Sequence, residues 1–309
     1  MNHYPEARPA ALTALLAEHY GVSPDETFVT RGTSEAIDLL IRCFCRPGVD
    51  EVVICPPTFG MYQVYADIQN AGIRRIPLVG PDFTIDTTAI VRAWDEHTRL
   101  LFLTSPNNPT GNSIPDAEIA SLCRRLDGRG LVILDAAYVE FADEDPTTRL
   151  LAAHENLVVL RTLSKAYGLA GARCGVALAR PAVIELLGKV MPPYAIPTPT
   201  VDVATAAILN ESFRVMPERI DRLRGERERV REALERCPDV RCVWPSDANF
   251  LLVRFRDSAA ALARAREAGL LLRDFGDQPG LENCLRITIG GEAENRRLLE
   301  ALTAQAVSA

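Results

Sequence analysis

The sequence predicts an α/β protein in which helices cover both faces of a mostly parallel sheet, followed by a smaller α+β region. Over the first two thirds of the 309 residues, short β-branched runs alternate with helical patterns. Several of these runs are apolar throughout, which is typical of parallel strands that are buried on both faces. Past about residue 205 the pattern changes. We therefore predict a large domain over residues 1–208 and a small domain over residues 209–309.

Seven strands and four helices are predicted in the large domain. The strands are Thr27–Arg31, Glu51–Cys55, Arg74–Leu78, Leu100–Thr104, Leu131–Asp135, Leu157–Thr162 and Arg173–Ala179. The helices lie near 34–45, 60–71, 115–126 and 181–190. Gly32, Thr33 and Ser34 come directly after the first strand and open the first helix. The free backbone N–H groups and the positive dipole end of that helix are suited to an anion.

The small domain is predicted to begin with a long charged helix near 214–236, rich in Glu and Arg on one face. The elements expected after it are strands Arg241–Trp244, Phe250–Phe255, Leu270–Arg273 and Leu285–Ile289, with helices at 257–268 and from 291. Prolines 192, 193, 197 and 199 predict an irregular segment just before the changeover. A substrate-contacting loop or a hinge could lie there.

Composition excludes several classes of protein. The formal charge is −7 and no block of Lys and Arg is present, so neither nucleic acid nor an anionic membrane is an expected partner. No apolar run reaches the length of about 18 residues that spans a bilayer, and the first residues do not form a secretory signal. With 48% hydrophobic residues, the chain is predicted to be a globular cytoplasmic protein.

Cysteine and histidine offer little material for a metal site. The eight cysteines are scattered without a C-x-x-C pair, so we expect them to be reduced core residues. The four histidines are isolated from one another along the chain. No metal is therefore predicted, and a Ser-His-Asp triad is also disfavoured. The scarcity of histidine favours a mechanism centred on lysine.

Lys165 lies in a segment with the groups needed to hold pyridoxal phosphate. Its amine can form a Schiff base with the cofactor's aldehyde, while Thr162, Ser164 and Arg173 can take the phosphate. Asp135, at the end of a predicted strand, can keep the pyridine nitrogen protonated so that the ring draws electrons. This set predicts amino-group chemistry.

Two further residues join this set through the order of the strands. The segment Ser105–Gly111 follows a strand and, taken alone, is typical of a rigid turn. Asp135, taken alone, fits an ordinary strand-end turn as well as it fits a functional role. Parallel strands, however, deliver Asn108, Asp135 and Lys165 to the same carboxyl edge of the sheet. Tyr138, three residues after Asp135, would reach the cofactor's phenolic oxygen together with Asn108. Both hydrogen bonds would tune the acidity of the imine.

These motifs resemble those of the fold type I pyridoxal-phosphate aminotransferases and, more closely, those of the histidinol-phosphate aminotransferases. The similarity runs from Tyr4 to the last helix. It is carried by Arg31-Gly-Thr-Ser-Glu-Ala-Ile-Asp, Cys55-Pro-Pro-Thr-Phe-Gly-Met-Tyr, Ser105-Pro-Asn-Asn-Pro-Thr-Gly, Arg161-Thr-Leu-Ser-Lys-Ala-Tyr-Gly-Leu-Ala-Gly and Gly280-Leu-Glu-Asn-Cys-Leu-Arg-Ile-Thr-Ile-Gly. A set of this size in this order is a specific signal.

The resemblance implies further cofactor contacts. Phe59 would stack on the pyridine face, where many relatives carry tyrosine, and stacking needs only ring area. Thr33 and Ser34 would contribute to the phosphate site. Tyr4 would reach the phosphate bound in the partner subunit. A site shared in this way implies a homodimer with two-fold symmetry.

The resemblance also implies a substrate site on the small domain. Arg273 and Arg286 lie near the ends of predicted strands, and either alone could be an ordinary surface arginine. In the family these positions bind the substrate phosphate and the carboxylates of glutamate, and arginine's planar fork suits both anions. Tyr194 would line the wall beside the imidazole, and Asn249 is a weaker candidate for substrate contact.

The implied activity is a ping-pong transamination in histidine biosynthesis. L-glutamate would react at the Lys165 aldimine and leave as 2-oxoglutarate, and imidazole-acetol phosphate would then become L-histidinol phosphate. A related lyase, such as threonine-phosphate decarboxylase, would keep Lys165, Asp135 and Asn108 but break another bond at Cα. A third alternative is a non-catalytic protein, either a cofactor-binding regulatory domain or a truncated, inactive copy. Family members carry an N-terminal arm before Tyr4, and this sequence starts almost at that residue.

Overall fold

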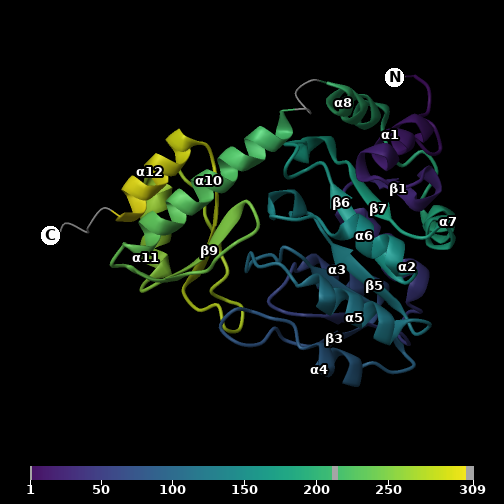
Figure 1. The fold of residues 1–309 in the computed structure, drawn as a ribbon, viewed down its shortest axis with the longest axis horizontal. Coiled ribbons are helices and arrows are strands. Elements are labelled where there is room, and N and C mark those ends of the chain that lie inside the picture. The colour runs from purple at the N-terminus through teal and green to yellow at the C-terminus, as the bar shows by residue number, and fades with distance from the viewer. Residues whose placement is uncertain (1, 211–214, 304–309) are drawn as a thin grey trace.

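The computed structural model describes residues 2–210 and 215–303, and its strands form two sheets (Figure 1). The larger sheet contains β1 (Thr27–Thr30), β2 (Glu51–Ile54), β3 (Gly72–Arg75), β4 (Thr98–Thr104), β5 (Leu131–Asp135), β6 (Leu157–Thr162) and β7 (Gly175–Leu178). Its strand order is β1-β7-β6-β5-β4-β2-β3. Strand β7 pairs antiparallel with β1 and β6, and the other pairs are parallel. The predicted mostly parallel sheet is therefore confirmed.

Five of these strands differ from their predicted bounds, and two of them, β7 and β3, follow residues in the left-handed backbone region. Arg173 has φ 55°, so the strand predicted from that residue begins only at Gly175. Asn70, at φ 55°, ends the preceding helix, and the chain enters the sheet at Gly72. Strand β3 therefore starts two residues earlier than the predicted Arg74 and ends at Arg75.

Helices cover both faces of this sheet (Figure 1). One face packs against α1 (Ala10–Tyr20), α4 (Thr87–Arg92), α5 (Asp116–Leu126), α6 (Thr147–Ala153) and α8 (Thr198–Leu209). The other face packs against α2 (Thr33–Phe44), α3 (Met61–Gln69) and α7 (Pro181–Val190). Successive strand residues alternate between the two cores, with Val53 in one and Val52 in the other. This alternation buries both faces of apolar strands.

Four of these helices were not predicted: α1, α4, α6 and α8. Residues 192–197, in the segment that the prolines marked as irregular, form no helix or strand, as predicted, and helix α8 begins directly after them. Pro197 is its N-cap and Pro199 lies in its first turn, where the missing N–H of proline breaks no helical hydrogen bond. The prolines therefore start this helix instead of preventing one. The short 3₁₀ helices are η1 (Pro24–Glu26), η2 (Val139–Phe141) and η3 (Ala170–Ala172).

The second sheet is antiparallel, with the order β10-β11-β9-β8. Its strands are β8 (Val240–Val243), β9 (Phe250–Phe255), β10 (Arg273–Asp274) and β11 (Cys284–Thr288). Apolar residues of α10 (Met216–Glu235), α11 (Ser258–Glu267) and α12 (Glu292–Thr303) pack with those of β9 and β11 in one core. Residue 214, where the charged helix was predicted to begin, lies outside the described residues.

The prediction of a strand over Leu270–Arg273 is wrong except at Arg273. Gly269, with φ 72°, ends α11, and the N–H of Leu270 bonds back to the carbonyl of Ala265. The turn at Ala268 and Gly269 therefore ends the helix, residues 270–272 form neither helix nor strand, and only Arg273 and Asp274 pair with β11.

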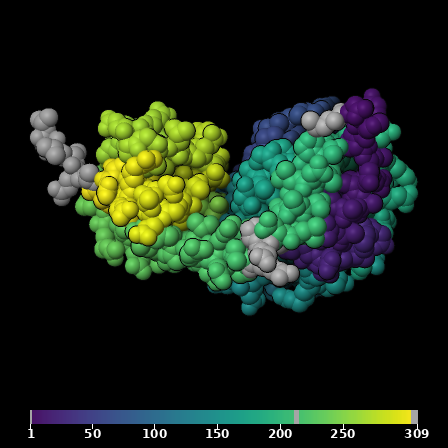
Figure 2. Space-filling model, turned by 90° about the horizontal axis from the view of Figure 1, so that it is seen from above, coloured from purple at the N-terminus to yellow at the C-terminus, as the bar shows by residue number. Residues whose placement is uncertain are grey.

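The two sheets lie in two lobes, which Figure 2 shows side by side with α10 extending from the smaller lobe toward the larger one. Arg227 of α10 is buried and connects the lobes. Its guanidinium donates to the carbonyl of Ala248 at 2.9 Å in the small lobe and to that of Phe141 at 3.5 Å in the large lobe. The domain boundary proposed after residue 208 falls near the end of α8 and stays a prediction.

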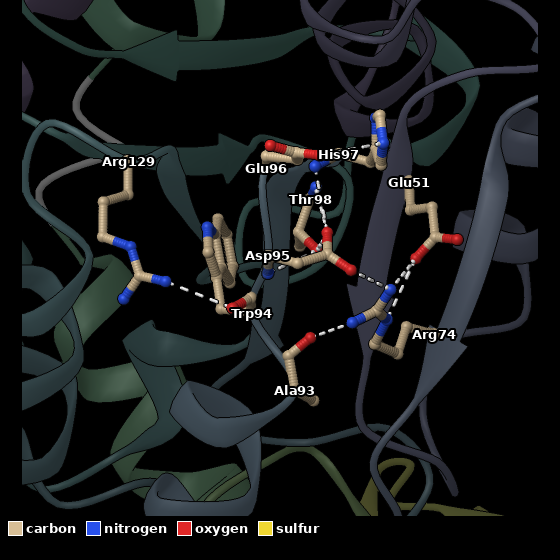
Figure 3. A network of polar contacts seen from close by, with 9 residues as sticks. All are labelled: Glu51, Arg74, Ala93, Trp94, Asp95, Glu96, His97, Thr98 and Arg129. Atoms are coloured by element: carbon tan, nitrogen blue, oxygen red, sulfur yellow. Dashed lines mark hydrogen bonds and ion pairs between the residues drawn. The ribbon is translucent and has the colours of Figure 1, made fainter.

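A polar network holds the strand edge at which β2 and β4 begin (Figure 3). Arg74 donates to Glu51 at 2.9 Å, to Asp95 at 2.7 Å and to the carbonyl of Ala93. The second oxygen of Asp95 accepts the backbone N–H of His97 at 2.9 Å. Because these donors surround Asp95, the pKa of that carboxyl lies well below its usual range. This network lies at the amino ends of the parallel strands.

Among residues 2–210 and 215–303, no helix combines the length and apolar character needed to cross a membrane.

Replacing Arg227 by alanine should weaken the connection between the lobes. The substitution leaves two buried carbonyls without their charged donor, so we expect the free energy of unfolding to fall by about 2 kcal/mol or more. Arg229 on the same helix is a matched control, because its partner Glu226 lies one turn away at the surface. Arg229→Ala should change the free energy by less than about 0.5 kcal/mol. Denaturant unfolding of both variants checks this, and equal effects would contradict the role given to Arg227.

Candidate active site

A pocket lies at the carboxyl ends of β4, β5 and β6, where ligands bind in open α/β sheets. Of the eleven residues that the sequence predicts for cofactor binding, ten line it. They are Thr33, Ser34, Phe59, Asn108, Asp135, Tyr138, Thr162, Ser164, Lys165 and Arg173. These side chains come from loops and element ends spread over about 140 residues of sequence, which the parallel strands bring together.

Asp135 is the last residue of β5, and only 3% of it is exposed. One carboxylate oxygen accepts the hydroxyl of Tyr62 at 2.9 Å, and the other accepts the backbone N–H of Ala137 at 3.2 Å. Burial raises the pKa of Asp135 to about 6, although the two hydrogen bonds and the positive charge of Lys165 act in the opposite direction. A carboxylate in this state is suited to a cationic partner.

The other end of the pocket is suited to an anion. Arg173 places its guanidinium against Gly32, so close that a Cβ at residue 32 would lie 2.6 Å from its nitrogen. The next residues, Thr33 and Ser34, form the first turn of α2, where backbone N–H groups have no partner inside the helix. The hydroxyl of Thr162 lies 3.0 Å from that of Ser164 in the same pocket. Together these groups form a cradle for a phosphate.

Lys165 and two aromatic rings lie between these ends. The Lys165 amine lies over the ring of Tyr138, 5.3 Å from its centroid, and Tyr138 packs edge-on against Phe250 of the small lobe at 5.1 Å. Phe59 packs edge-on against Tyr62 with 5.6 Å between the centroids. The pocket therefore combines a free amine, a buried carboxylate, an anion cradle and an aromatic wall. These are the groups that pyridoxal phosphate needs, so the residues fit that cofactor.

Arg273 and Arg286 lie directly opposite each other on β10 and β11. Both guanidinium groups lie over Phe275, at 5.8 and 5.7 Å from the ring centroid, and Arg286 also lies over Phe250 at 4.8 Å. Arg286 reaches across to the large lobe, where it donates to the side-chain oxygen of Asn108 at 2.6 Å. Like charges at directly paired positions repel each other, so this arrangement favours an anion between them.

Arg273 and Arg286 do not line the pocket themselves, and neither do three other predicted residues, Tyr4, Tyr194 and Asn249. Tyr4 is 85% exposed and stacks on Tyr194, with 5.1 Å between the ring centroids. Tyr194 is about half exposed and has a left-handed backbone, with φ 61°. The backbone carbonyl of Asn249 accepts the N–H of Ile289, which ties β9 to the end of β11. The roles predicted for these residues toward substrate or a partner subunit stay predictions.

The sequence analysis missed Tyr62 and Thr104. Thr104 lines the pocket, and the hydroxyl of Tyr62 lies 2.7 Å from it as well as bonding to Asp135. Tyr62 is fully buried on the apolar face of α3, so its spacing predicts a core residue. The available signal for Thr104 was its position at the carboxyl end of the strand beside that of Asp135.

Comparison with known proteins agrees with this geometry. A family model described as "Aminotransferase class I and II" matches residues 1–302. A histidinol-phosphate aminotransferase of Xanthomonas euvesicatoria is 46% identical over 304 residues, which cover 97% of this chain and 84% of the relative.

Two solved structures are also similar. A histidinol-phosphate aminotransferase of Sinorhizobium meliloti in complex with pyridoxal 5′-phosphate superposes with a TM-score of 0.87 at 25% identity, over 97% of this chain and 82% of that one. The L-threonine-O-3-phosphate decarboxylase of Porphyromonas gingivalis gives a TM-score of 0.82 at 25% identity, over 97% of this chain and 89% of that one. Given the family match over nearly its whole length and the identity to the Xanthomonas relative, the chain belongs to the histidinol-phosphate aminotransferases, within the class I and II aminotransferases.

Proposed function

We propose that this protein transfers an amino group from L-glutamate to imidazole-acetol phosphate, giving 2-oxoglutarate and L-histidinol phosphate, in histidine biosynthesis. The observation that carries the proposal is a single pocket holding the amine of Lys165, the carboxylate of Asp135 and a phosphate cradle, with Arg286 of the small lobe bonded to Asn108 in its wall. The relatives named above support the choice of substrates.

Pyridoxal phosphate is the proposed cofactor. When bound, it supplies an aldehyde that links to amines and a pyridine ring that withdraws electrons from the substrate's α-carbon. Thr33, Ser34, Thr162, Ser164 and Arg173 would hold its phosphate. Asp135 would keep a proton on the ring nitrogen, Phe59 would cover one face of the ring, and Asn108 and Tyr138 would bond to its phenolic oxygen.

Lys165 is proposed as the group that links to the cofactor and moves the proton. It is the only lysine lining the pocket, and its amine lies over the ring of Tyr138. As a base, the amine takes the proton from the substrate's α-carbon. Arg273 and Arg286 orient the anionic ends of both substrates, because guanidinium groups bind carboxylate and phosphate with similar geometry.

One related function has a specific observation in its favour. The similarity to a threonine-phosphate decarboxylase extends over 97% of this chain, and such an enzyme would use the same lysine and aspartate. Release of carbon dioxide without any need for a keto acid would identify that reaction. The predicted cytoplasmic location, and the homodimer in which Tyr4 reaches the partner's site, stay predictions.

Replacing Lys165 by alanine should abolish both turnover and covalent capture of the cofactor. The chain contains only two lysines, Lys165 and Lys189, so the attachment site is easy to identify. We expect 2-oxoglutarate to form from glutamate and imidazole-acetol phosphate with the parent protein, and borohydride to fix the cofactor on the peptide that contains Lys165.

Lys189→Ala is the control for this experiment. Lys189 is exposed on α7 and pairs with Glu185 at 2.7 Å, away from the pocket. Replacing Lys189 should leave the turnover rate and the borohydride trapping of the cofactor on Lys165 unchanged. Turnover that persists in Lys165→Ala would exclude the proposed mechanism. Cofactor binding by the parent without turnover would instead identify a non-catalytic protein.

Arg286→Lys should weaken the binding of both anionic substrates while leaving the cofactor bound. Lysine keeps the charge but loses the planar fork, so we expect kcat/KM for glutamate and for imidazole-acetol phosphate to fall roughly tenfold or more. Arg256→Lys is a matched control in the small lobe, because that side chain donates to the carbonyl of Pro238 at the surface. Steady-state kinetics with both substrates checks this, and an unchanged kcat/KM for either substrate counts against the role given to Arg286.

The cofactor-free protein should reveal the cost of ionising Asp135. A carboxyl whose folded pKa is raised to about 6 contributes stability at acidic pH, and this contribution is lost as the pH rises from about 4 through 6. Asp135→Asn should therefore be more stable than the parent at pH 8, by up to about 3 kcal/mol, with about half of that advantage at pH 5 and little at pH 3.5. Denaturant unfolding across this range measures the difference. A difference independent of pH would show that Asp135 does not titrate there.

A further inference from the structure

A line of buried hydroxyl groups leads from the interior of the large lobe to Asp135. The hydroxyl of Tyr62 lies 2.9 Å from one carboxylate oxygen of Asp135 and 2.7 Å from the hydroxyl of Thr104. The hydroxyl of Thr104 lies 3.1 Å from that of Thr58. All four residues are at least nine-tenths buried. Tyr62 is completely buried, so its hydroxyl must find its partners among these neighbouring groups.

Counting protons gives the direction of the hydrogen bonds. An ionised carboxylate only accepts, so Tyr62 must donate its single proton to Asp135. The oxygen of Tyr62 then accepts the proton of Thr104. The hydroxyl of Thr58 lies 3.1 Å from that of Thr104 and also donates to the side-chain oxygen of Asn107 at 3.3 Å. The hydroxyl groups of Tyr62 and Thr104 thus both point toward one carboxylate. Hydrogen bonds aligned in this way polarise one another, and a bond that ends on a charge is stronger than a neutral one.

The location of Tyr62 separates it from the groups that touch ligands. Thr104 lines the pocket and Tyr62 does not, so Tyr62 acts only through its neighbours. Its ring stacks on Phe102 with 4.8 Å between the centroids and meets Phe59 edge-on. Burial raises the pKa of the Tyr62 hydroxyl well above its ordinary value, so it remains a donor over the working pH range.

We propose that Tyr62, supported by Thr104, is a positioning residue that holds the Asp135 carboxylate ionised and oriented toward the cofactor's ring nitrogen. This inference rests on the proposed function, because the proposed cofactor supplies the cationic partner of Asp135 in the pocket. One oxygen of Asp135 is fixed by Tyr62 and the other by the N–H of Ala137, so the plane of the carboxylate is set from both sides. Both oxygens keep a further lone pair for the ring.

Tyr62→Phe isolates the hydroxyl, because phenylalanine keeps the ring contacts with Phe102 and Phe59. In the reconstituted holoenzyme we expect kcat to fall about tenfold, with KM for glutamate within twofold of the parent. We also expect the dissociation constant for pyridoxal phosphate to rise about tenfold, which corresponds to about 1.4 kcal/mol. The low-pH limit of kcat should move to higher pH, because the lost hydrogen bond had favoured the ionised carboxylate.

Matched variants distinguish this role from general packing. Tyr20→Phe also removes a buried tyrosine hydroxyl, and that hydroxyl has no hydrogen-bond partner among the described residues. It should leave kcat and cofactor affinity within twofold of the parent. Thr104→Val should reproduce part of the Tyr62→Phe loss, while Thr104→Ser, which keeps the hydroxyl, should restore parental values. These two variants also test the line if Tyr62→Phe does not fold.

A double-mutant cycle provides the decisive measurement. In an Asp135→Asn background the tyrosine has no carboxylate to orient, so adding Tyr62→Phe should change cofactor affinity by less than twofold. A tenfold change in that background would overturn the proposal, as would a Tyr62→Phe variant with parental kcat and cofactor affinity. Cofactor affinity is measured without turnover. A parent that binds pyridoxal phosphate but transfers no amino group would therefore refute the proposed function and still test Tyr62.

Discussion

The burial of one carboxylate constrains how the rest of the site is built. Asp135 has lost almost all contact with water, and its two hydrogen bonds and the nearby Lys165 offset only part of the cost of its charge. A further cation next to this carboxylate lowers that cost. The protein without its cofactor is therefore held in an electrostatically unfavourable arrangement, which the protonated ring nitrogen of the proposed cofactor relieves. Binding affinity and ring protonation then have the same physical origin.

The sheet determines where this carboxylate lies. Asp135 pairs with Thr104 of β4 on one side and with Leu160 of β6 on the other, so the parallel strands end nearly level. Their carboxyl ends supply the site, whereas their amino ends carry the Arg74 network of Figure 3. Polar groups at the amino ends have their partners within the Arg74 network, which suits stability. Polar groups at the carboxyl ends face a pocket, which suits chemistry.

The parts of the fold and site that depend on pattern could be predicted from the sequence. Apolar strands and their parallel order are enough to bring Asn108, Asp135 and Lys165 to one edge. Tyr62 could not be found in this way, because its hydroxyl acquires a role only through Asp135, 73 residues further along the chain. Helix α8 was missed because prolines end some helices and start others, and the sequence alone does not say which. The strand predicted at Leu270 failed because Gly269 redirects the chain.

The two arginines of the small lobe form a second electrostatically unfavourable arrangement, in addition to the buried carboxylate of Asp135. Arg273 and Arg286 are paired across β10 and β11, and Phe275 lies beneath both without neutralising either. Arg286 compensates partly by donating to Asn108 in the wall of the large-lobe pocket. An anionic substrate bound at these arginines, as proposed, would reduce the repulsion between them and compete with Asn108 for the Arg286 guanidinium. Substrate binding would thus release the Asn108 side chain for the cofactor, which couples occupation of the small-lobe arginines to the hydrogen bonding of the ring.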